Sequence, residues 1–254
     1  MWGREAVRVN ADLAFAFTLA DAADAVTSAR FRASDLRVET KPDLSPVSEA
    51  DRAAEEAIRA LVASSGRGEG VLGEEFGDDG GDAKWIVDPI DGTTNYVRGV
   101  PVWATLLALE RDGLVCASLV SAPALGRRWW AARGEGAFAD GSRCRVSAVS
   151  RLEDATVSTT SSRHMPGGWS EIVDRAWANR GLGDFWQHCL VAEGAVDVAC
   201  DRVMNVWDYA PVQLIVEEAG GRCTTFDGGV PRAGESFVAT NGRLHEEVVS
   251  LLGV

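Results

Sequence analysis

The hydrophobic pattern changes near residue 71, and this change constrains the fold more than any other feature of the chain. Before it, apolar residues recur at helical spacing, as Leu13, Phe17 and Ala20 do within the first thirty residues. After it, the chain consists of short apolar runs separated by turn sequences such as "RDG" and "ADG", which are typical of hairpins. Helices followed by such strands predict an α/β protein in which helices cover a sheet.

The other predicted elements extend this order along the chain. The prolines of "KPDLSPVSEAD" (41–51) predict an extended segment, a second helix follows it, and "SSGRGEG" (64–70) is a predicted loop. The predicted strands of the middle region are "GVLGEE", "KWIVDPI", "WATLLALE", "LVCASLVSA", "RRWWAAR" and "GAFAD". After residue 150, strands and helices alternate through "ATVSTT", "SEIVDRAWANR", "HCLVAEGAVDVAC", "YAPVQLIVEEAGG", "RCTTF", "SFVATN" and "RLHEEVVSLL". This order predicts a sandwich of two sheets with a seam near 145–155 and two closely packed halves, residues 1–148 and 149–254.

Charge and cysteine content narrow the class of partner. A net charge of −13 disfavours nucleic acids and anionic membranes, but not a small phosphorylated molecule, because bound metal ions can reverse the local sign. We expect no secretory signal and no membrane span, since no apolar run is long enough. The five cysteines are scattered without a Cys-x-x-Cys pair, which favours free thiols in a reducing cytoplasm over disulfides or zinc.

Acidic residues stand where predicted strands or turns end: Asp51, Glu74, Glu75, Asp88, Asp91 and Asp208. Taken singly, each is explained better by local structure than by function. Asp51 follows Ser48 at the spacing of a helix capping box, and Asp208 could be the N-cap of its helix, with Pro211 in the first turn. Asp88 and Asp91 could be turn formers.

Taken together, the acidic residues indicate a metal site centred on "DPIDGT". Asp88 ends a buried strand, and Pro89 stiffens the turn that carries it, the Ile90 carbonyl and Asp91. Two carboxylates and a carbonyl on a rigid turn are oxygen ligands of the kind that Mg²⁺ prefers. The chain has only three histidines, which suits Mg²⁺ or Mn²⁺ better than zinc.

The residues after this turn indicate phosphate chemistry. Gly92 and Thr93 offer backbone N–H groups and a hydroxyl, which are the donors that a phosphate group needs. The reaction that fits is metal-assisted hydrolysis of a phosphomonoester by in-line attack of water. No Gly-x-Ser-x-Gly nucleophile motif is present to compete with it.

Three spaced motifs resemble the inositol-monophosphatase-like, Mg²⁺-dependent phosphatases: "GEE" (73–75), "DPIDGTTN" (88–95) and "WD" (207–208). The resemblance covers nearly the whole chain. Within the family, the sequence is most similar to histidinol-phosphate phosphatases of the actinobacterial type, on the stretches "TKPDLSPVSEADRA", "VRGVPVWATLLAL", "SAPALGRRWWAARGEGAF", "LVAEGAVDVA" and "ATNGRLHEEV". The resemblance implies a layered α/β/α/β/α sandwich and a cytoplasmic homodimer that uses two or three Mg²⁺ ions.

The resemblance also implies a role for each motif residue. Glu74, Asp88 and the Ile90 carbonyl would bind one metal ion, Asp88, Asp91 and Asp208 a second, and Glu74 a weaker third. Thr93, supported by Asp51, would polarise the attacking water, and the N–H groups of Gly92 and Thr93 would hold the phosphate. Lys41 matches a family lysine that precedes this segment, whereas Thr94 stands where related histidinol phosphatases often have lysine.

Selectivity for the alcohol is expected to lie in the second half of the chain. Asp184 and Asp201 fall where the family contacts the alcohol, beside Asp91 and Asp208, and acidic residues there would suit the cationic amine of histidinol. The alternative is that Asp184 closes a turn and Asp201 ends a strand. Inositol monophosphate, fructose bisphosphate or a phosphoadenosine nucleotide are the competing substrates. A non-catalytic binding protein is disfavoured because every metal carboxylate is present.

Two further expectations concern residues outside these motifs. His164 lacks a spaced partner and is expected in a surface loop rather than in a metal site. The tryptophans at five positions are expected in the core or at an interface: Trp2, Trp85, Trp169, Trp177 and Trp186.

Overall fold

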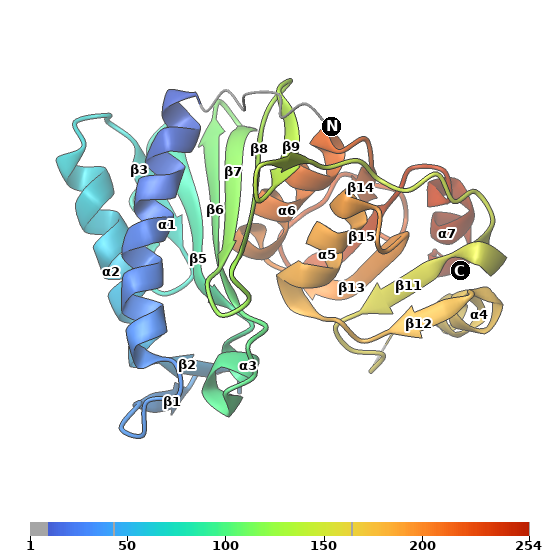
Figure 1. Cartoon of the computed structure of the whole chain (residues 1–254), viewed down its shortest axis with the longest axis horizontal. Coiled ribbons are helices and arrows are strands. Elements are labelled where there is room, and N and C mark those ends of the chain that lie inside the picture. The colour runs from blue at the N-terminus through green and yellow to red at the C-terminus, as the bar shows by residue number, and fades with distance from the viewer. Residues whose placement is uncertain (1–9, 43, 164, 254) are drawn as a thin grey trace, which may run out of the picture.

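Helical and sheet layers alternate through the molecule, as the computed structural model shows for residues 10–42, 44–163 and 165–253 (Figure 1). The first layer consists of α1 (Ala11–Arg30) and α2 (Glu49–Ser64), which are joined through a small hairpin of β1 (Val38–Thr40) and β2 (Pro46–Ser48). Small buried side chains of α1, including Ala16, Ala20 and Ala23, allow the two helices to pack closely.

The larger sheet forms the second layer, and its strand order over the described residues is β10-β9-β8-β7-β6-β5-β3-β4. Its strands are β3 (Gly70–Gly73), β4 (Gly77–Asp78), β5 (Ala83–Asp91), β6 (Ala104–Arg111), β7 (Leu114–Ala122), β8 (Arg127–Ala132), β9 (Gly136–Ala139) and β10 (Ser142–Arg143). Every neighbouring pair is antiparallel except β3 and β5, which run parallel. The short helix α3 (Thr93–Arg98) follows β5.

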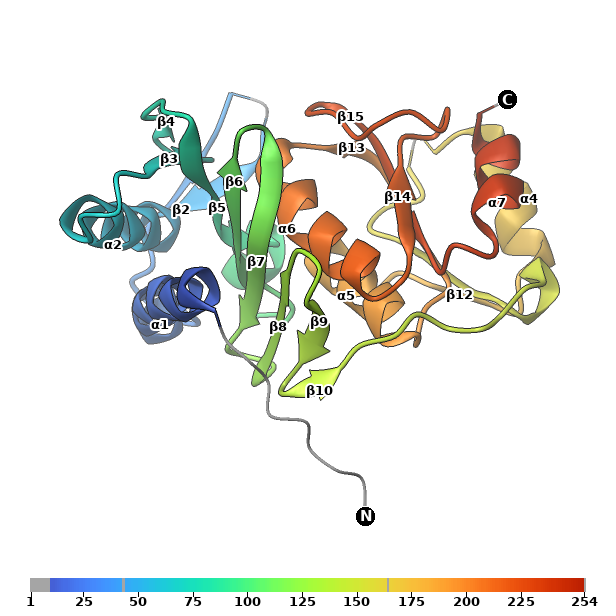
Figure 2. The same ribbon diagram turned by 90° about the horizontal axis from the view of Figure 1, so that it is seen from above.

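The remaining layers belong to the second half of the chain. The smaller sheet has the order β12-β11-β13-β15-β14, with β11 (Thr156–Thr159), β12 (Ala178–Arg180), β13 (Val198–Met204), β14 (Arg222–Thr224) and β15 (Glu235–Thr240). Its helices are the 3₁₀ turn η1 (Leu152–Asp154), α4 (Gly167–Arg175), α5 (Asp184–Glu193), α6 (Val206–Glu218) and α7 (His245–Leu252). Helices α5 and α6 lie between the two sheets, and α4 and α7 cover the outer face of the smaller one (Figure 2).

Helix α6 shows why the middle layer forms. Its residues Val212, Leu214, Ile215 and Val216 are all buried, so it is apolar on more than one side, as expected for a helix enclosed between two sheets. It contacts β5 to β9 of the larger sheet and β14 and β15 of the smaller one. The predicted five-layer α/β/α/β/α fold is therefore confirmed.

Several local predictions need correction. "SEIVDRAWANR" divides into α4 and β12, and α3, β4 and β10 were not expected. Helix α6 begins at Val206, so Asp208 is its third residue and not its N-cap, which is Asn205. Pro211 consequently lies in the second turn, where it provides no N–H for the Trp207 carbonyl.

Cysteines and tryptophans mostly follow expectation. All five cysteines are free and four of them are buried, with Cys116 partly exposed. Trp85 and Trp169 are buried, whereas Trp177 has 73% of its surface exposed and is not a core residue. His164 and Trp2 lie outside the described residues. Among the described helices, none combines the length and apolarity needed to cross a membrane.

Candidate metal and phosphate site

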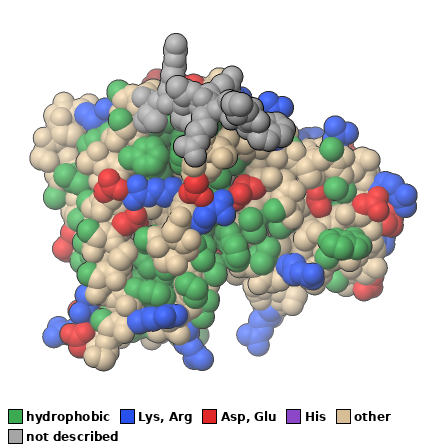
Figure 3. All heavy atoms as spheres, in the orientation of Figure 1, with side chains coloured by type: hydrophobic (Ala, Val, Ile, Leu, Met, Phe, Trp, Pro, Cys, Tyr) green, Lys and Arg blue, Asp and Glu red, His purple; other side chains and the backbone are tan. Residues whose placement is uncertain are grey.

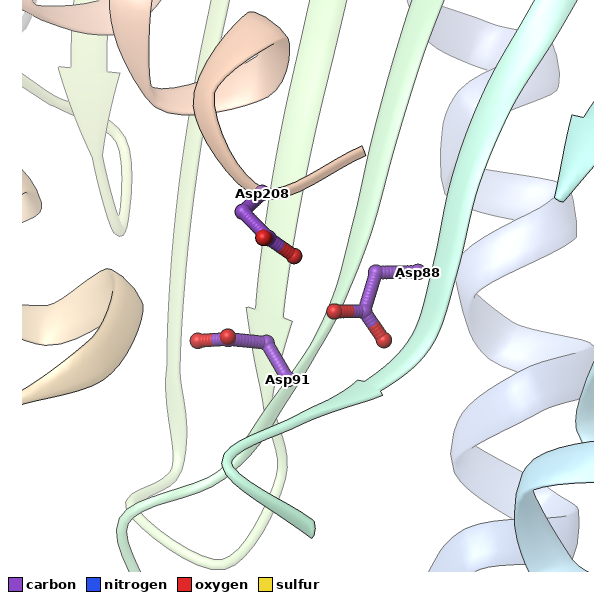
Figure 4. A group of neighbouring side chains, drawn as sticks. All are labelled: Asp88, Asp91 and Asp208. Atoms are coloured by element: carbon purple, nitrogen blue, oxygen red, sulfur yellow. The ribbon is translucent and has the colours of Figure 1, made fainter. Parts of the chain in front are cut away.

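Three aspartates from two distant parts of the chain lie close together (Figure 4). Asp88 and Asp91 come from the end of β5, and Asp208 comes from the first turn of α6. One carboxylate oxygen from each lies within 4.8 Å of the others. The larger sheet and the middle helical layer therefore meet at this point, and each contributes ligand atoms.

The end of β5 is irregular, and this irregularity presents both aspartates on the same side. The register with β6 shifts between Asp88 and Asp91. The Ile90 N–H donates to Asp88 Oδ1 at 2.9 Å, and the Thr105 hydroxyl donates to the Pro89 carbonyl at 2.8 Å. These bonds fix the turn that the sequence predicted to be rigid.

Glu74 reaches the same place because β3 runs parallel to β5. Gly73 pairs with Val87, and the Glu74 N–H donates to the Val87 carbonyl at 3.2 Å, so Glu74 lies beside Asp88. Its carboxylate accepts a hydrogen bond from Lys41 Nζ at 2.9 Å, and Lys41 also contacts Glu75 at 2.6 Å. In this structure Lys41 thus pairs with the GEE turn.

The electrostatics of the cluster favour a cation. Burial, followed by the neighbouring carboxylates, raises the pKa of both Asp88 and Asp91 well above the ordinary range. Burial is also the main cause that raises the pKa of Asp208 to about 7. No described Lys or Arg forms an ion pair with these three aspartates. Oxygen donors held together against their own repulsion fit a hard divalent cation.

Thr93 and Asp51 are in contact next to the cluster. The Thr93 hydroxyl lies 2.9 Å from the Ile90 carbonyl and 3.2 Å from Asp51 Oδ1. The other Asp51 oxygen accepts from the backbone N–H and the hydroxyl of Ser48, which confirms the predicted capping box of α2. Burial raises the pKa of Asp51 to about 6.

Gly92 allows the backbone to approach the site closely. It precedes α3 with a φ of +80°, a conformation that suits glycine. A Cβ at this position would lie 3.0 Å from the Val102 carbonyl and 3.2 Å from Asp184 Oδ2. The Gly92 backbone therefore lies so close to Val102 and Asp184 that a side chain at this position would be crowded.

A cavity of about 320 Å³ adjoins the aspartate cluster on the side of the smaller sheet. Asp91 and Asp208 line it together with Asp184 at the start of α5 and Asp201 on β13. The Phe185 N–H donates to Asp91 Oδ2 at 2.7 Å, which joins α5 to β5. In the orientation of Figure 1, the lower edge of the molecule is notched, and Lys and Arg side chains are visible on both sides of the notch (Figure 3).

Asp184 and Asp201 are both held by hydrogen bonds from neighbouring side chains. Asn95 Nδ2 donates to Asp184 Oδ2 at 2.9 Å, and burial followed by the charge of Asp201 raises the pKa of Asp184 to about 6. Asp201 accepts from Gln187 Nε2 at 2.5 Å, and His188 Nε2 lies 2.9 Å from the same oxygen. Within the described ranges, no Lys or Arg pairs with either carboxylate.

Sequence reasoning missed the residues that hold these two carboxylates. Asn95 could have been noticed, because it belongs to the "DPIDGTTN" stretch. Nothing in the sequence near Gln187 and His188 indicates their role, because both lie on α5 and their partners lie on strands of the smaller sheet. Arg163 and Arg202 also line the cavity and were not predicted.

A family model for the inositol monophosphatase family matches residues 9–253. The chain belongs to this family. A histidinol-phosphatase from Mycobacterium tuberculosis is 51% identical, over 95% of this chain and 97% of the relative, and one from Streptomyces coelicolor is 49% identical, over 95% and 96%. A solved inositol monophosphatase from Thermotoga maritima is 34% identical with a TM-score of 0.89, over 95% of this chain and 96% of that one.

Family membership agrees with the geometry. Members of the inositol monophosphatase family are metal-dependent and act on small phosphorylated substrates. The acidic cluster of Asp88, Asp91 and Asp208, with Glu74 beside it, is the candidate metal site of this chain.

Proposed function

We propose that this protein is a Mg²⁺-dependent phosphatase that converts L-histidinol phosphate and water to L-histidinol and phosphate, in cytoplasmic histidine biosynthesis. The similarity of nearly the whole chain to two histidinol-phosphatases supports the substrate. The inositol monophosphatase family supports the reaction class.

One observation on this chain carries the choice of substrate. Asp184 and Asp201 line the cavity next to the candidate metal cluster, and no described Lys or Arg neutralises them. Histidinol carries an ammonium group, and a charge-assisted hydrogen bond to a carboxylate is stronger than a bond between neutral groups. A neutral polyol could hydrogen-bond to these carboxylates but would offer no positive charge to them. We therefore assign Asp184 and Asp201 to the alcohol end of the substrate.

We assign the metal ligands as the family resemblance implies. Glu74, Asp88 and the Ile90 carbonyl would hold one ion, and Asp88, Asp91 and Asp208 would hold the second. Glu74 would also contact a weaker third ion, and Mn²⁺ would be a suitable substitute for Mg²⁺. When bound, divalent cations at these residues would supply positive charge for the phosphate oxygens and the leaving alkoxide.

The residues beside the cluster move the proton and hold the phosphate. The attacking water gives a proton toward Thr93 Oγ1 while the Thr93 hydroxyl hydrogen shifts toward Asp51 Oδ1, 3.2 Å away. Asp51 is held for this role by two hydrogen bonds from Ser48. The N–H groups of Gly92 and Thr93 bind the phosphate oxygens. The protein acts as a homodimer, which sedimentation would test.

A panel of phosphomonoesters tests the substrate. With Mg²⁺, phosphate release from L-histidinol phosphate should exceed release from inositol 1-phosphate, fructose 1,6-bisphosphate and a 3′-phosphoadenosine nucleotide in kcat/KM. A preference for inositol 1-phosphate by more than about tenfold, or about 1.4 kcal/mol in transition-state binding, would contradict the proposed substrate. Hydrolysis of none of these esters would favour the non-catalytic alternative.

A further inference from the structure

A buried hydrogen-bond network lies behind the two acidic side chains of the cavity, and Gln187 of α5 is at its centre. Gln187 has no exposed surface. Its Oε1 accepts from the Ser158 hydroxyl at 2.8 Å, and its Nε2 donates to Asp201 Oδ2 at 2.5 Å and to Thr160 Oγ1 at 3.2 Å. Because both ends of the amide are engaged, the side chain is held in one orientation.

Thr160 extends this network to Asp184. Its Oγ1 accepts from the Asp184 backbone N–H at 2.8 Å, and its own N–H donates to Asp201 Oδ1 at 3.1 Å. Asp184 has a φ of +47°, in the left-handed region that residues with a side chain adopt less often. Gln187 therefore supports the carboxylate of Asp201 directly and the backbone of Asp184 through Thr160.

The charges around the network leave room for a cationic ligand group. Over the described part of the chain, neither Asp184 nor Asp201 has an Arg or Lys partner, and Arg163 and Arg202 line the same cavity without forming an ion pair with either. The Asp201 carboxylate is only 12% exposed, and its charge is offset by the donors on α5 and Thr160. If one of these donors moved, the Asp201 carboxylate would change its position in the cavity.

We propose that Gln187 is a positioning residue for substrate specificity, which holds Asp184 and Asp201 where they receive the cationic end of the substrate alcohol. This inference rests on the proposed function. Gln187 is hydrogen-bonded to Ser158, Thr160 and Asp201, and among the described residues it has no hydrogen bond to Asp88, Asp91 or Asp208. Its effect should therefore be confined to the alcohol side of the site.

The test compares two substrates in the full-length enzyme with saturating Mg²⁺: L-histidinol phosphate, and glycerol 2-phosphate, whose alcohol is neutral. Gln187→Leu should raise KM for L-histidinol phosphate by about tenfold or more, with a smaller change in kcat, because a charge-assisted contact is lost. For glycerol 2-phosphate, KM and kcat of the Gln187→Leu variant should stay within about twofold of the wild-type values. Gln213→Leu is the matched control, since Gln213 lies on α6 and bonds only to Glu217 among the described residues.

Each outcome separates the two hypotheses. A wild-type enzyme that does not prefer L-histidinol phosphate contradicts the proposed function. If the wild type has this preference and the Gln187→Leu variant retains it, only the positioning role is overturned. The same holds if the variant loses activity equally toward both substrates. If Gln187→Leu does not fold, Ser158→Ala replaces it, because this change frees the far end of Gln187 and should reduce the same preference by a smaller factor. An unchanged preference in folded Ser158→Ala would then overturn the positioning role.

Discussion

Asp51 shows how one side chain combines a structural and a chemical role. One of its carboxylate oxygens closes the capping box with Ser48, and the other contacts the Thr93 hydroxyl. The capping bonds fix the direction of the carboxylate, so the contact with Thr93 needs no further ordering. The local explanation of Asp51 and the proposed role in water activation are therefore compatible.

Thr93 gives a direct test of that role. Thr93→Val keeps the shape of the side chain and removes the hydroxyl, so kcat should fall by about 100-fold or more, as for loss of general acid–base assistance. Thr93→Ser keeps the hydroxyl and should retain most of kcat. Steady-state kinetics at saturating Mg²⁺ measure both, and a Thr93→Val enzyme with more than a tenth of wild-type kcat would contradict the role.

At the residue scale, the "DPIDGT" stretch was predictable because its groups lie close together in the sequence. Asp88, Ile90 and Asp91 share one turn, and their oxygen atoms were a reason to predict a metal site there. Gln187 was not predictable, because its partners Ser158 and Asp201 lie on two different strands. Gln187 can contact both Ser158 and Asp201 because β11 pairs with β13.

At the scale of elements, the GEE turn is held in place by α2. Buried Glu55 accepts from the Glu75 N–H at 2.8 Å and from the Phe76 N–H at 3.2 Å, and Arg59 Nε donates to it at 2.8 Å. A Cβ at Gly73 would lie only 1.9 Å from Glu55 Oε1. Gly73 therefore gives Glu55 the space to hold the turn that carries Glu74.

Gly73→Ala should disturb this turn. The new methyl group would displace Glu55 and shift Glu74, which should destabilise the fold by about 1–3 kcal/mol, the usual cost of overpacking. The Mg²⁺ concentration for half-maximal activity should also rise. Gly167→Ala is the matched control, because its Cβ would meet no atom within 4 Å. Thermal unfolding and Mg²⁺ titration measure both effects, and an unchanged Mg²⁺ requirement in Gly73→Ala would contradict this role of the turn.

Long elements with a regular pattern were predicted, whereas the two-residue strands β4 and β10 were not. "LVCASLVSA" corresponds to β7 from Leu114 to Ala122. β4 and β10 contain only two residues each, which is too short for a pattern. Helix α3 is bounded by Gly92 and Gly99, both in the left-handed conformation. Its six residues are too few to show a helical pattern in the sequence.

On the scale of the whole molecule, the candidate site depends on how the two halves are packed. β5 supplies Asp88 and Asp91, and α6, which follows the smaller sheet's β13, supplies Asp208. Because α6 is buried against both sheets, the three carboxylates are brought together by the global fold. The division of the chain at residue 148 stays a prediction.

This packing predicts a pH dependence of stability in the metal-free protein. The folded-state pKa of Asp208 is raised to about 7, and those of Asp88 and Asp91 are also raised, above the value of about 4 in an unfolded chain. The folded state then binds more protons than the unfolded state between these values, so the free energy of unfolding falls as pH rises toward 7 and beyond. His245, whose pKa burial lowers to about 4, acts in the opposite direction below about pH 6.5.

Thermal unfolding in EDTA between pH 6.5 and 8 isolates the carboxylates. The wild-type Tm should fall over this range, Mg²⁺ should restore it most at pH 8, and Asp208→Asn should flatten the pH dependence. Asp174→Asn, an exposed change on α4, should behave as wild type. A wild-type Tm in EDTA that rises with pH, or an equal slope in Asp208→Asn, would contradict this electrostatic account.

The central claim is that the carboxylate cluster is the metal-dependent catalytic site, and Asp91→Asn tests it most directly. The variant keeps the size of the side chain and removes one ligand charge from the cluster. Turnover of L-histidinol phosphate with saturating Mg²⁺, measured beside Asp174→Asn, should be nearly abolished in Asp91→Asn while its circular dichroism spectrum stays that of the folded protein. Full turnover in folded Asp91→Asn would contradict the claim.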